Sequence, residues 1–166
     1  MKAEEFYRPI YKSLENVTPI KKDCGILCGG ICCEDGEEKT GMLLFPFEEK
    51  ILSGKGYEIE KSNCEYGDDK TAPILFCSGY CDRKFRPLSC MIFPLTPYLK
   101  KGKLKLIMNP AARGMCPLAR SLEPEQLEPL FVKNVYKAMK RIMKLKDGED
   151  YINMLTEISD SYFNIM

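Results

Sequence analysis

The sequence predicts an α+β fold, a small irregular cysteine-rich domain with short strands and a C-terminal helical pair. Three observations predict it. Apolar residues recur at helical spacing near both ends of the chain, short alternating stretches lie between them, and the nine cysteines fall between Cys24 and Cys116. A chain of 166 residues that is 45% hydrophobic is large enough for one domain with a real core. We expect a single domain over 1–166, with a cysteine-rich part at about 20–118 and a helical buttress at about 122–164.

Helical periodicity is clearest at the two ends of the chain. Residues 3–15 carry five apolar or aromatic side chains at helix-like spacing, and Pro9 predicts either a helix start nearby or a kink. A second helical stretch is expected from about 124–145. Asp147-Gly148 breaks it, and a last helix is expected at about 149–163. These two helices are predicted to form an antiparallel pair.

Short strands are expected in the middle of the chain. Residues 57–61 alternate between apolar and polar side chains, which predicts a strand. Residues 73–77 and 104–108 are candidates for two more. Pro46 suits the first turn of a short helix that the glycines at 54 and 56 would end.

The charge pattern argues against several classes of partner. Lys and Arg number 25 and Asp and Glu 24, so the net charge is +1 and neither nucleic acid nor an anionic membrane is an expected partner. No apolar run approaches the ~20 residues of a membrane span, and the N-terminus lacks an apolar signal core. We expect a cytoplasmic protein, for which a protein partner is conceivable but unspecified.

The chain has nine cysteines and no histidine. In a reducing compartment clustered thiols bind metal or do redox chemistry more often than they form disulfides. The absence of histidine excludes mixed Cys/His zinc sites and catalysis by Ser-His-Asp or Cys-His groups. Sulfur ligands favour zinc or an iron–sulfur cluster over calcium or magnesium.

Four thiols and three glycines share one stretch of ten residues, Cys24-Gly-Ile-Leu-Cys28-Gly-Gly-Ile-Cys32-Cys33. On a regular helix each of the first three thiols would lie about 6 Å along the axis from the next. Two thiolates on one zinc ion lie at most about 4.6 Å apart. The glycines at 25, 29 and 30 allow positive φ and let the backbone fold back. We therefore interpret the stretch as a chelating loop rather than a helix.

The remaining cysteines provide partners for this loop. Adjacent side chains point in different directions, so Cys32 and Cys33 indicate two sites, a cluster, or one ligand and one spare thiol. Cys64 is left over and suits a small buried hydrophobe. A buried thiolate site needs cations nearby, for which the basic residues at 83, 84 and 86 are candidates. The predicted ligands would fill two four-sulfur sites and are Cys24, Cys28, Cys32, Cys33, Cys77, Cys81, Cys90 and Cys116.

The cysteine run, together with Arg86-Pro87-Leu-Ser-Cys90-Met-Ile-Phe-Pro94, resembles the zinc- or iron-chelating CxxCxxCC family (YkgJ-like). The resemblance covers about 24–117. It implies metal chelation by the cysteines and, more distantly, a relation to the cysteine-rich region of flagellin lysine N-methylases. The sequence departs from the family pattern in its first spacing, x3 in place of x2, and in Met91, where the family has arginine.

Three functions remain open at this point. One is a metal-binding module whose zinc or cluster is structural. The second is an iron–sulfur enzyme for redox or protein methyl transfer, and the third is a dithiol redox protein. Saturated four-cysteine sites favour the first, because a catalytic metal keeps an open position. No phosphate-binding loop, nucleophile elbow or catalytic carboxylate pair identifies a substrate, so whether the chain is an enzyme is left open.

Overall fold

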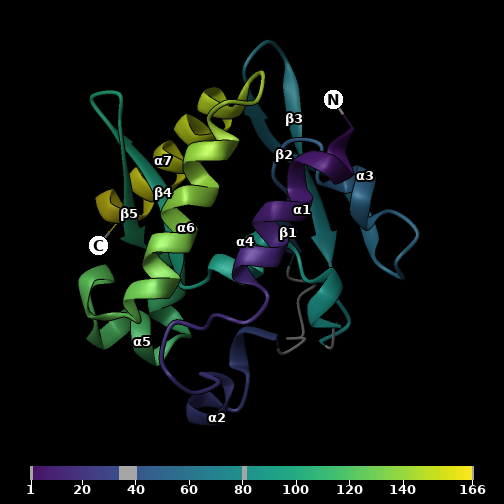
Figure 1. Cartoon of the computed structure of the whole chain (residues 1–166). Coiled ribbons are helices and arrows are strands. Elements are labelled where there is room, and N and C mark those ends of the chain that lie inside the picture. Colours follow the sequence, from purple (N-terminus) through teal and green to yellow (C-terminus); the bar gives the residue numbers. More distant parts are fainter. Residues whose placement is uncertain (1, 34–40, 80–81, 166) are drawn as a thin grey trace.

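The computed structural model describes residues 2–33, 41–79 and 82–165, without the side chain of Arg83. It confirms the α+β class (Figure 1). One antiparallel sheet has the strand order β1-β3-β2, and a separate two-stranded hairpin pairs β4 with β5. The strands are β1 (Gly41–Leu43), β2 (Glu58–Tyr66), β3 (Lys70–Phe76), β4 (Leu95–Lys100) and β5 (Lys103–Met108).

Three long helices carry most of the helical structure, namely α1 (Ala3–Leu14), α6 (Pro129–Ile142) and α7 (Gly148–Ile165). The N-terminal helix begins at Ala3 and continues through Pro9, so the expected start near Pro9 is wrong. Pro9 is exposed, so its ring lies on the solvent side. The second helix begins at Pro129 rather than near residue 124, because proline at the first helical position forces the preceding residue out of the helical region.

Short helical turns connect these elements. The predicted helix after Pro46 begins only at Glu49, while Gly54 and Gly56 have positive φ, as expected for the residues that end it. The turns are α2 (Gly25–Cys28), η1 (Ile31–Cys33), α3 (Glu49–Leu52), η2 (Arg83–Phe85), α4 (Leu88–Ile92), η3 (Pro110–Gly114), α5 (Pro117–Ser121) and η4 (Pro124–Gln126).

Two of the strands contain proline, which is unusual for a sheet. Pro73 lies in β3, the central strand, opposite Lys61 on β2. The β2–β3 register shifts between Lys61 and Glu65, and such an irregularity is where a sheet tolerates proline. Pro97 lies in β4, a strand that the sequence did not predict because Pro97 interrupts it and Pro94 directly precedes it.

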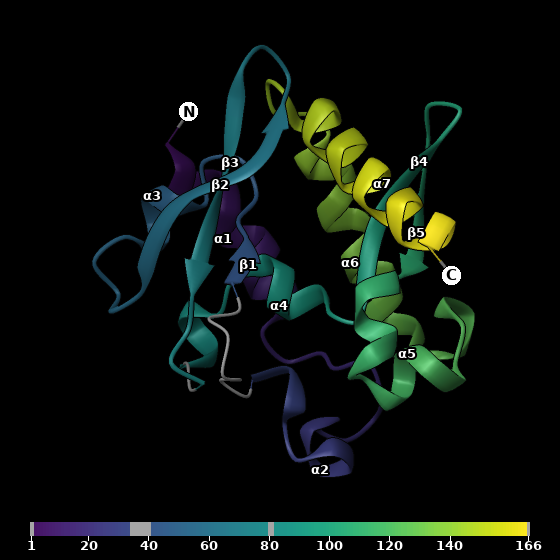
Figure 2. The same ribbon diagram turned by 180° about the vertical axis from the view of Figure 1, so that it is seen from behind.

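The main hydrophobic core joins α1, α6, α7 and both sheets. Helix α7 packs mainly on β4 and also on β2, whereas α6 packs on α1 and β5. Figures 1 and 2 show α7 crossing the β4–β5 hairpin, with its C-terminal end on the hairpin side of the molecule. The two C-terminal helices thus pack mainly on strands and on α1. They do not pack chiefly on each other, as the predicted antiparallel pair would. None of the helices in the described part of the chain is both long and apolar enough to cross a membrane.

Candidate metal centre

The cysteine loop forms one helical turn, a reversal and a 3₁₀ turn. The side chain of Asp23 accepts a hydrogen bond from Gly25 N at 3.0 Å, at the start of α2. Gly29 and Gly30 follow this turn with φ of 69° and 74°. A Cβ at either glycine would meet nothing within 4 Å, so glycine serves the backbone conformation and not a close contact.

These observations test the predicted chelating loop. The left-handed conformation of Gly29 and Gly30 is confirmed, and the chain reverses there so that Cys33 N donates to Gly30 O at 2.7 Å. The expectation for Gly25 is wrong, because it lies in the first turn of α2 with an ordinary φ. The expectation of a loop without helix is wrong for the first part of the stretch, because α2 is a helical turn over Gly25–Cys28. Cys28 Sγ lies 3.7 Å from Cys24 O.

Cys116 lies against this loop although the two are far apart in the sequence. It is 7% exposed and precedes α5, which starts at Pro117. It forms a small buried cluster with three residues of η3 and α5, against which Cys24 packs. Both views place α2 and α5 at the same end of the molecule, opposite the β2–β3 turn (Figures 1 and 2). The structure therefore brings together thiols from both ends of the cysteine-rich segment.

The thiols at this end share one electrostatic environment. Burial raises the pKa of Cys24, and the charges of Asp23, Cys116 and Cys28 raise it further. Desolvation raises the pKa of Cys32 to about 12, helped by the charge and hydrogen bond of Cys33 and by the charges of Cys24 and Cys28. Without a cation Cys24 and Cys32 therefore favour the thiol form, whereas metal ligands are thiolates. The group consists of Cys24, Cys28, Cys32, Cys33 and Cys116, and we call it the thiol cluster.

The other predicted ligands lie elsewhere or outside the described residues. Cys90 lies on α4 near Tyr11, whose pKa is raised by burial and by Glu48 and, to a smaller extent, by the charge of Cys90. Cys77 follows β3 and packs against a separate hydrophobic cluster of Leu44, Leu52 and Leu75. Cys81 lies outside the described residues.

Cys64, which the sequence left without a role, lies on β2 and packs against the main core. Its backbone N–H donates to Ser62 Oγ at 3.0 Å. This position agrees with the interpretation of Cys64 as a small hydrophobe. It also makes Cys64 a cysteine outside the thiol cluster that can serve as a control.

The donor set of the thiol cluster fits zinc or an iron–sulfur cluster in kind, since it consists of sulfur alone. Within residues 2–33, 41–79 and 82–165, no three or more Cys, Asp or Glu side chains are arranged to hold one ion. The described residues thus supply the ligand type and the proximity of two chain segments, and they do not by themselves form a closed coordination shell.

A buried carboxylate links α1 to the helix that carries Cys90, and sequence reasoning missed it. Glu48 is fully buried, and its Oε1 accepts hydrogen bonds from Tyr11 Oη at 2.5 Å and from Leu88 N at 2.6 Å. Its Oε2 accepts from Phe45 N at 2.9 Å. Desolvation raises the pKa of Glu48 to about 7, partly offset by these three donors. The signal that could have identified Glu48 as a buried carboxylate is its position within the largely apolar run 42–52.

A second missed group is Arg113, which lies on η3 three residues before Cys116. Its Nε is buried and has no hydrogen-bond partner among the described residues. The sequence had named residues 83, 84 and 86 as the cations of the site. Of these, Lys84 is exposed, and the side chain of Arg83 is outside the description. A guanidinium with unused donor capacity near Cys116 is a further candidate for offsetting thiolate charge.

Comparison of the chain with family models, with curated proteins and with solved structures finds no match. The resemblance to the CxxCxxCC family therefore stays a prediction based on the motifs of the sequence.

Proposed function

We propose that this protein is a cytoplasmic metal-binding module that holds zinc or an iron–sulfur cluster through cysteine thiolates. The observation that supports this most is that Cys24 packs against the buried cluster that contains Cys116, close enough for the charge of Cys116 to raise the pKa of Cys24 beyond the larger effect of burial. Two distant segments of the chain thus place thiols near each other. The proposed ligands come first from the thiol cluster. Cys77, Cys81 and Cys90 remain candidates from the sequence pattern.

The exposure of the cysteine loop supports a metal over simple packing. None of residues 24–33 is fully buried. Ile26 is 77% exposed and Leu27 is 63% exposed, so the apolar side chains of α2 contribute little burial. A segment that buries so little apolar surface gains little from the hydrophobic effect. Bonds from its thiolates to a shared metal would supply the missing stabilisation.

The electrostatics of the site support a cationic neighbour as well. Four thiolates on Zn²⁺ carry a net charge of about −2, which a partly buried site must offset with cations or amide donors. Arg113 holds a buried nitrogen without a hydrogen-bond partner among the described residues, three positions from Cys116. We propose that its guanidinium faces the thiolates of the metal-bound protein. Replacement by Gln would then weaken metal retention without preventing folding.

Metal analysis of anaerobically purified protein tests the proposal. We expect stoichiometric zinc or iron in the wild type and a loss of most of it in Cys24→Ser and Cys116→Ser. Cys64→Ser is the matched control, since Cys64 lies on β2 outside the thiol cluster, and it should keep its metal. Metal-free wild-type protein under these conditions would contradict metal binding. Equal metal in all three variants would contradict the assignment of Cys24 and Cys116 as ligands.

The same preparation separates the two kinds of metal. A brown protein with visible charge-transfer absorption indicates an iron–sulfur cluster, whereas a colourless protein with bound zinc excludes it. Cys77→Ser adds a second distinction. Cys77 packs with Leu44, Leu52 and Leu75, so retained metal in this variant would remove Cys77 from the ligand set, and lost metal would restore it.

A further inference from the structure

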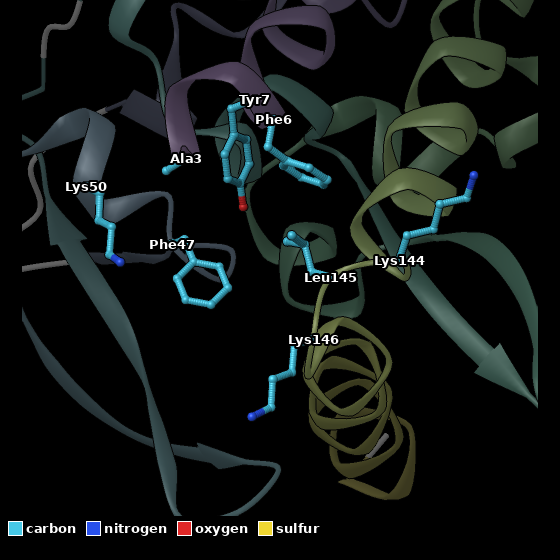
Figure 3. Close-up of a pocket in the computed structure, with 8 residues that line it drawn as sticks. All are labelled: Ala3, Phe6, Tyr7, Phe47, Lys50, Lys144, Leu145 and Lys146. Atoms are coloured by element: carbon cyan, nitrogen blue, oxygen red, sulfur yellow. The ribbon is translucent and has the colours of Figure 1, made fainter. Parts of the chain in front are cut away.

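A cavity of about 270 Å³ lies between α1, the segment before α3, and the turn that joins α6 to α7 (Figure 3). Its apolar walls are Phe6 and Tyr7 from α1, together with Phe47 and Leu145. Phe6, Tyr7 and Leu145 are buried, so these walls are fixed by the main core. A cavity of this size is near the lower end of the range for small-molecule sites.

Phe47 is held in the cavity by an unusual backbone conformation. Its φ is 68°, in the left-handed region that bulky side chains rarely adopt. The ring forms one side of the cavity, and Lys50 Nζ lies 5.0 Å from the centroid of that ring. The backbone strain thus accompanies an aromatic surface that is partly open and has a cation beside it.

Two lysines give the cavity a positive mouth. Figure 3 shows the side chains of Lys50 and Lys146 on the Phe47 side of the cavity, while Lys144 extends away from it. Neither Lys50 nor Lys146 forms an ion pair with a carboxylate of the described residues. Asp147, next to Lys146, is instead paired with Lys70. Among the described residues, therefore, no carboxylate is paired with either ammonium group.

The positive charge continues beyond this cavity. A larger cavity of about 720 Å³ shares Tyr7 and Lys50 with it and is lined by further basic residues, namely Lys2, Arg8, Lys55 and Lys84. The one acidic residue among its described lining is Glu4, which lies 3.7 Å from Arg8 in an ion pair. Since the whole chain has a net charge of only +1, this face concentrates positive charge and attracts anions.

We propose that the cavity binds a small organic anion. Its carboxylate or phosphate head would lie between Lys50 and Lys146, and its aromatic or branched aliphatic body would contact Phe6, Phe47 and Leu145. The Tyr7 hydroxyl already donates to Pro46 O at 2.7 Å, so charge and shape provide the recognition. The proposal does not rest on metal binding at the thiol cluster.

Calorimetric titration of the full chain with matched ligands tests this site. The ligands are 3-phenylpropionate, phenyl phosphate, and the neutral 3-phenylpropanol, which has the same body as the first. We expect the two anions to bind and the alcohol to bind at least about tenfold more weakly, since a charged hydrogen bond contributes about one such factor. The two anions carry a carboxylate and a phosphate on a phenyl body, so their relative affinities indicate which kind of head group the site prefers.

Variants locate the binding to the cavity. Lys50→Gln and Lys146→Gln should each weaken phenylpropionate binding about five- to tenfold and leave 3-phenylpropanol unchanged. Lys137→Gln is the matched control, because Lys137 is exposed on α6 outside both cavities, and it should bind as the wild type does. Phe47→Leu keeps an apolar side chain and should weaken both anions by removing the aromatic wall.

Three results would overturn the proposal. The first is no binding of either anion, and the second is equal binding of acid and alcohol. The third is an equal effect of all three lysine substitutions, which would indicate general attraction to a basic surface. The three lysine variants are at the surface, whereas Phe47→Leu changes a half-buried side chain. Thermal unfolding of every variant, recorded alongside, confirms that a loss of binding is not a loss of fold.

Discussion

The two ends of this molecule are stabilised by different means. In the core, Phe131, Val135 and Met139 on α6 are fully buried against α1, α7 and the strands. In the cysteine loop none of residues 24–33 is fully buried, and Ile26 and Leu27 point their apolar surface to solvent. Apolar burial is worth about 25 cal/mol per Å², so it holds the core and leaves the loop without comparable support. The loop therefore needs another source of stability, for which the thiols are the chemical candidates.

The largest expected effect is in the core. Phe131→Ala removes a fully buried ring and should lower the free energy of unfolding by about 3–5 kcal/mol, measured by chemical denaturation. The loss should be the same with and without a metal chelator. Leu130→Ala is the control, since Leu130 is 54% exposed on the same helix and should change stability by less than about 0.5 kcal/mol. Equal losses in the two variants would mean that the core is not where the structure places it.

The next effect is a pH dependence centred on Glu48, which joins α1 to α4. Folding raises the pKa of Glu48 from its usual 4.5 to about 7, so the folded protein holds a proton that the unfolded chain has released. This stabilisation is complete below about pH 4.5 and is lost as the pH rises through about 7. Between pH 5 and pH 8 the free energy of unfolding should therefore fall by about 2–3 kcal/mol from this group.

Glu48→Gln isolates this contribution, because an amide keeps the shape of the side chain and does not titrate. Urea denaturation at several pH values should show a flatter profile in the variant than in the wild type. Parallel profiles would show that Glu48 has an ordinary pKa in the folded protein. The variant should also be less stable at all pH values, since its amide NH₂ would face a donor among Tyr11, Leu88 and Phe45.

Removal of metal should separate the two ends directly. If the thiol cluster holds a metal, a strong chelator should increase amide hydrogen exchange at least about tenfold in residues 24–33 and in α5. Exchange in α6 and α7 should stay unchanged, because their burial does not involve the thiols. Mass-spectrometric exchange with and without chelator measures both ends in one experiment. The same change in exchange at both ends on adding chelator would contradict the idea that only the cysteine end is stabilised by metal.

The smallest effect compares two glycines with the same backbone conformation. Gly29 in the cysteine loop and Gly102 in the β4–β5 turn have φ of 69° and 71°, and a Cβ at either would meet nothing within 4 Å. Replacement by Ala should cost about 1 kcal/mol at each position. Only Gly29→Ala should also weaken metal retention, measured by competition with a chromogenic chelator. A similar loss in Gly102→Ala would assign the effect to general destabilisation.

Much of the local structure could be predicted from the sequence. The spacing of apolar residues gave α1 and α7, and Asp147-Gly148 marked the start of α7. There a Cβ on Gly148 would lie 2.0 Å from Ile142 O. The glycine pair at 29–30 predicted the chain reversal between the thiols. These features are local because periodicity and backbone freedom act over a few neighbouring residues.

Other features of the fold and site could not be predicted in this way. Pro73 lies in a central strand only because the opposite strand shifts its register. The charge of Glu48 is tolerated in the interior only because donors from α1, Phe45 and α4 meet there. Neither depends on local sequence preference, since each requires groups that are far apart in the chain.

By itself the sequence determined an α+β chain with sulfur as its distinctive ligand and with glycines that let the cysteine loop reverse. Only the tertiary structure decided that Cys24 packs against the cluster that contains Cys116, while Cys77 packs with another cluster. The physical reason is that the identity of a residue fixes its chemistry as a possible ligand. Its neighbours in space depend on how α1, α5 and the strands bury their apolar surfaces together.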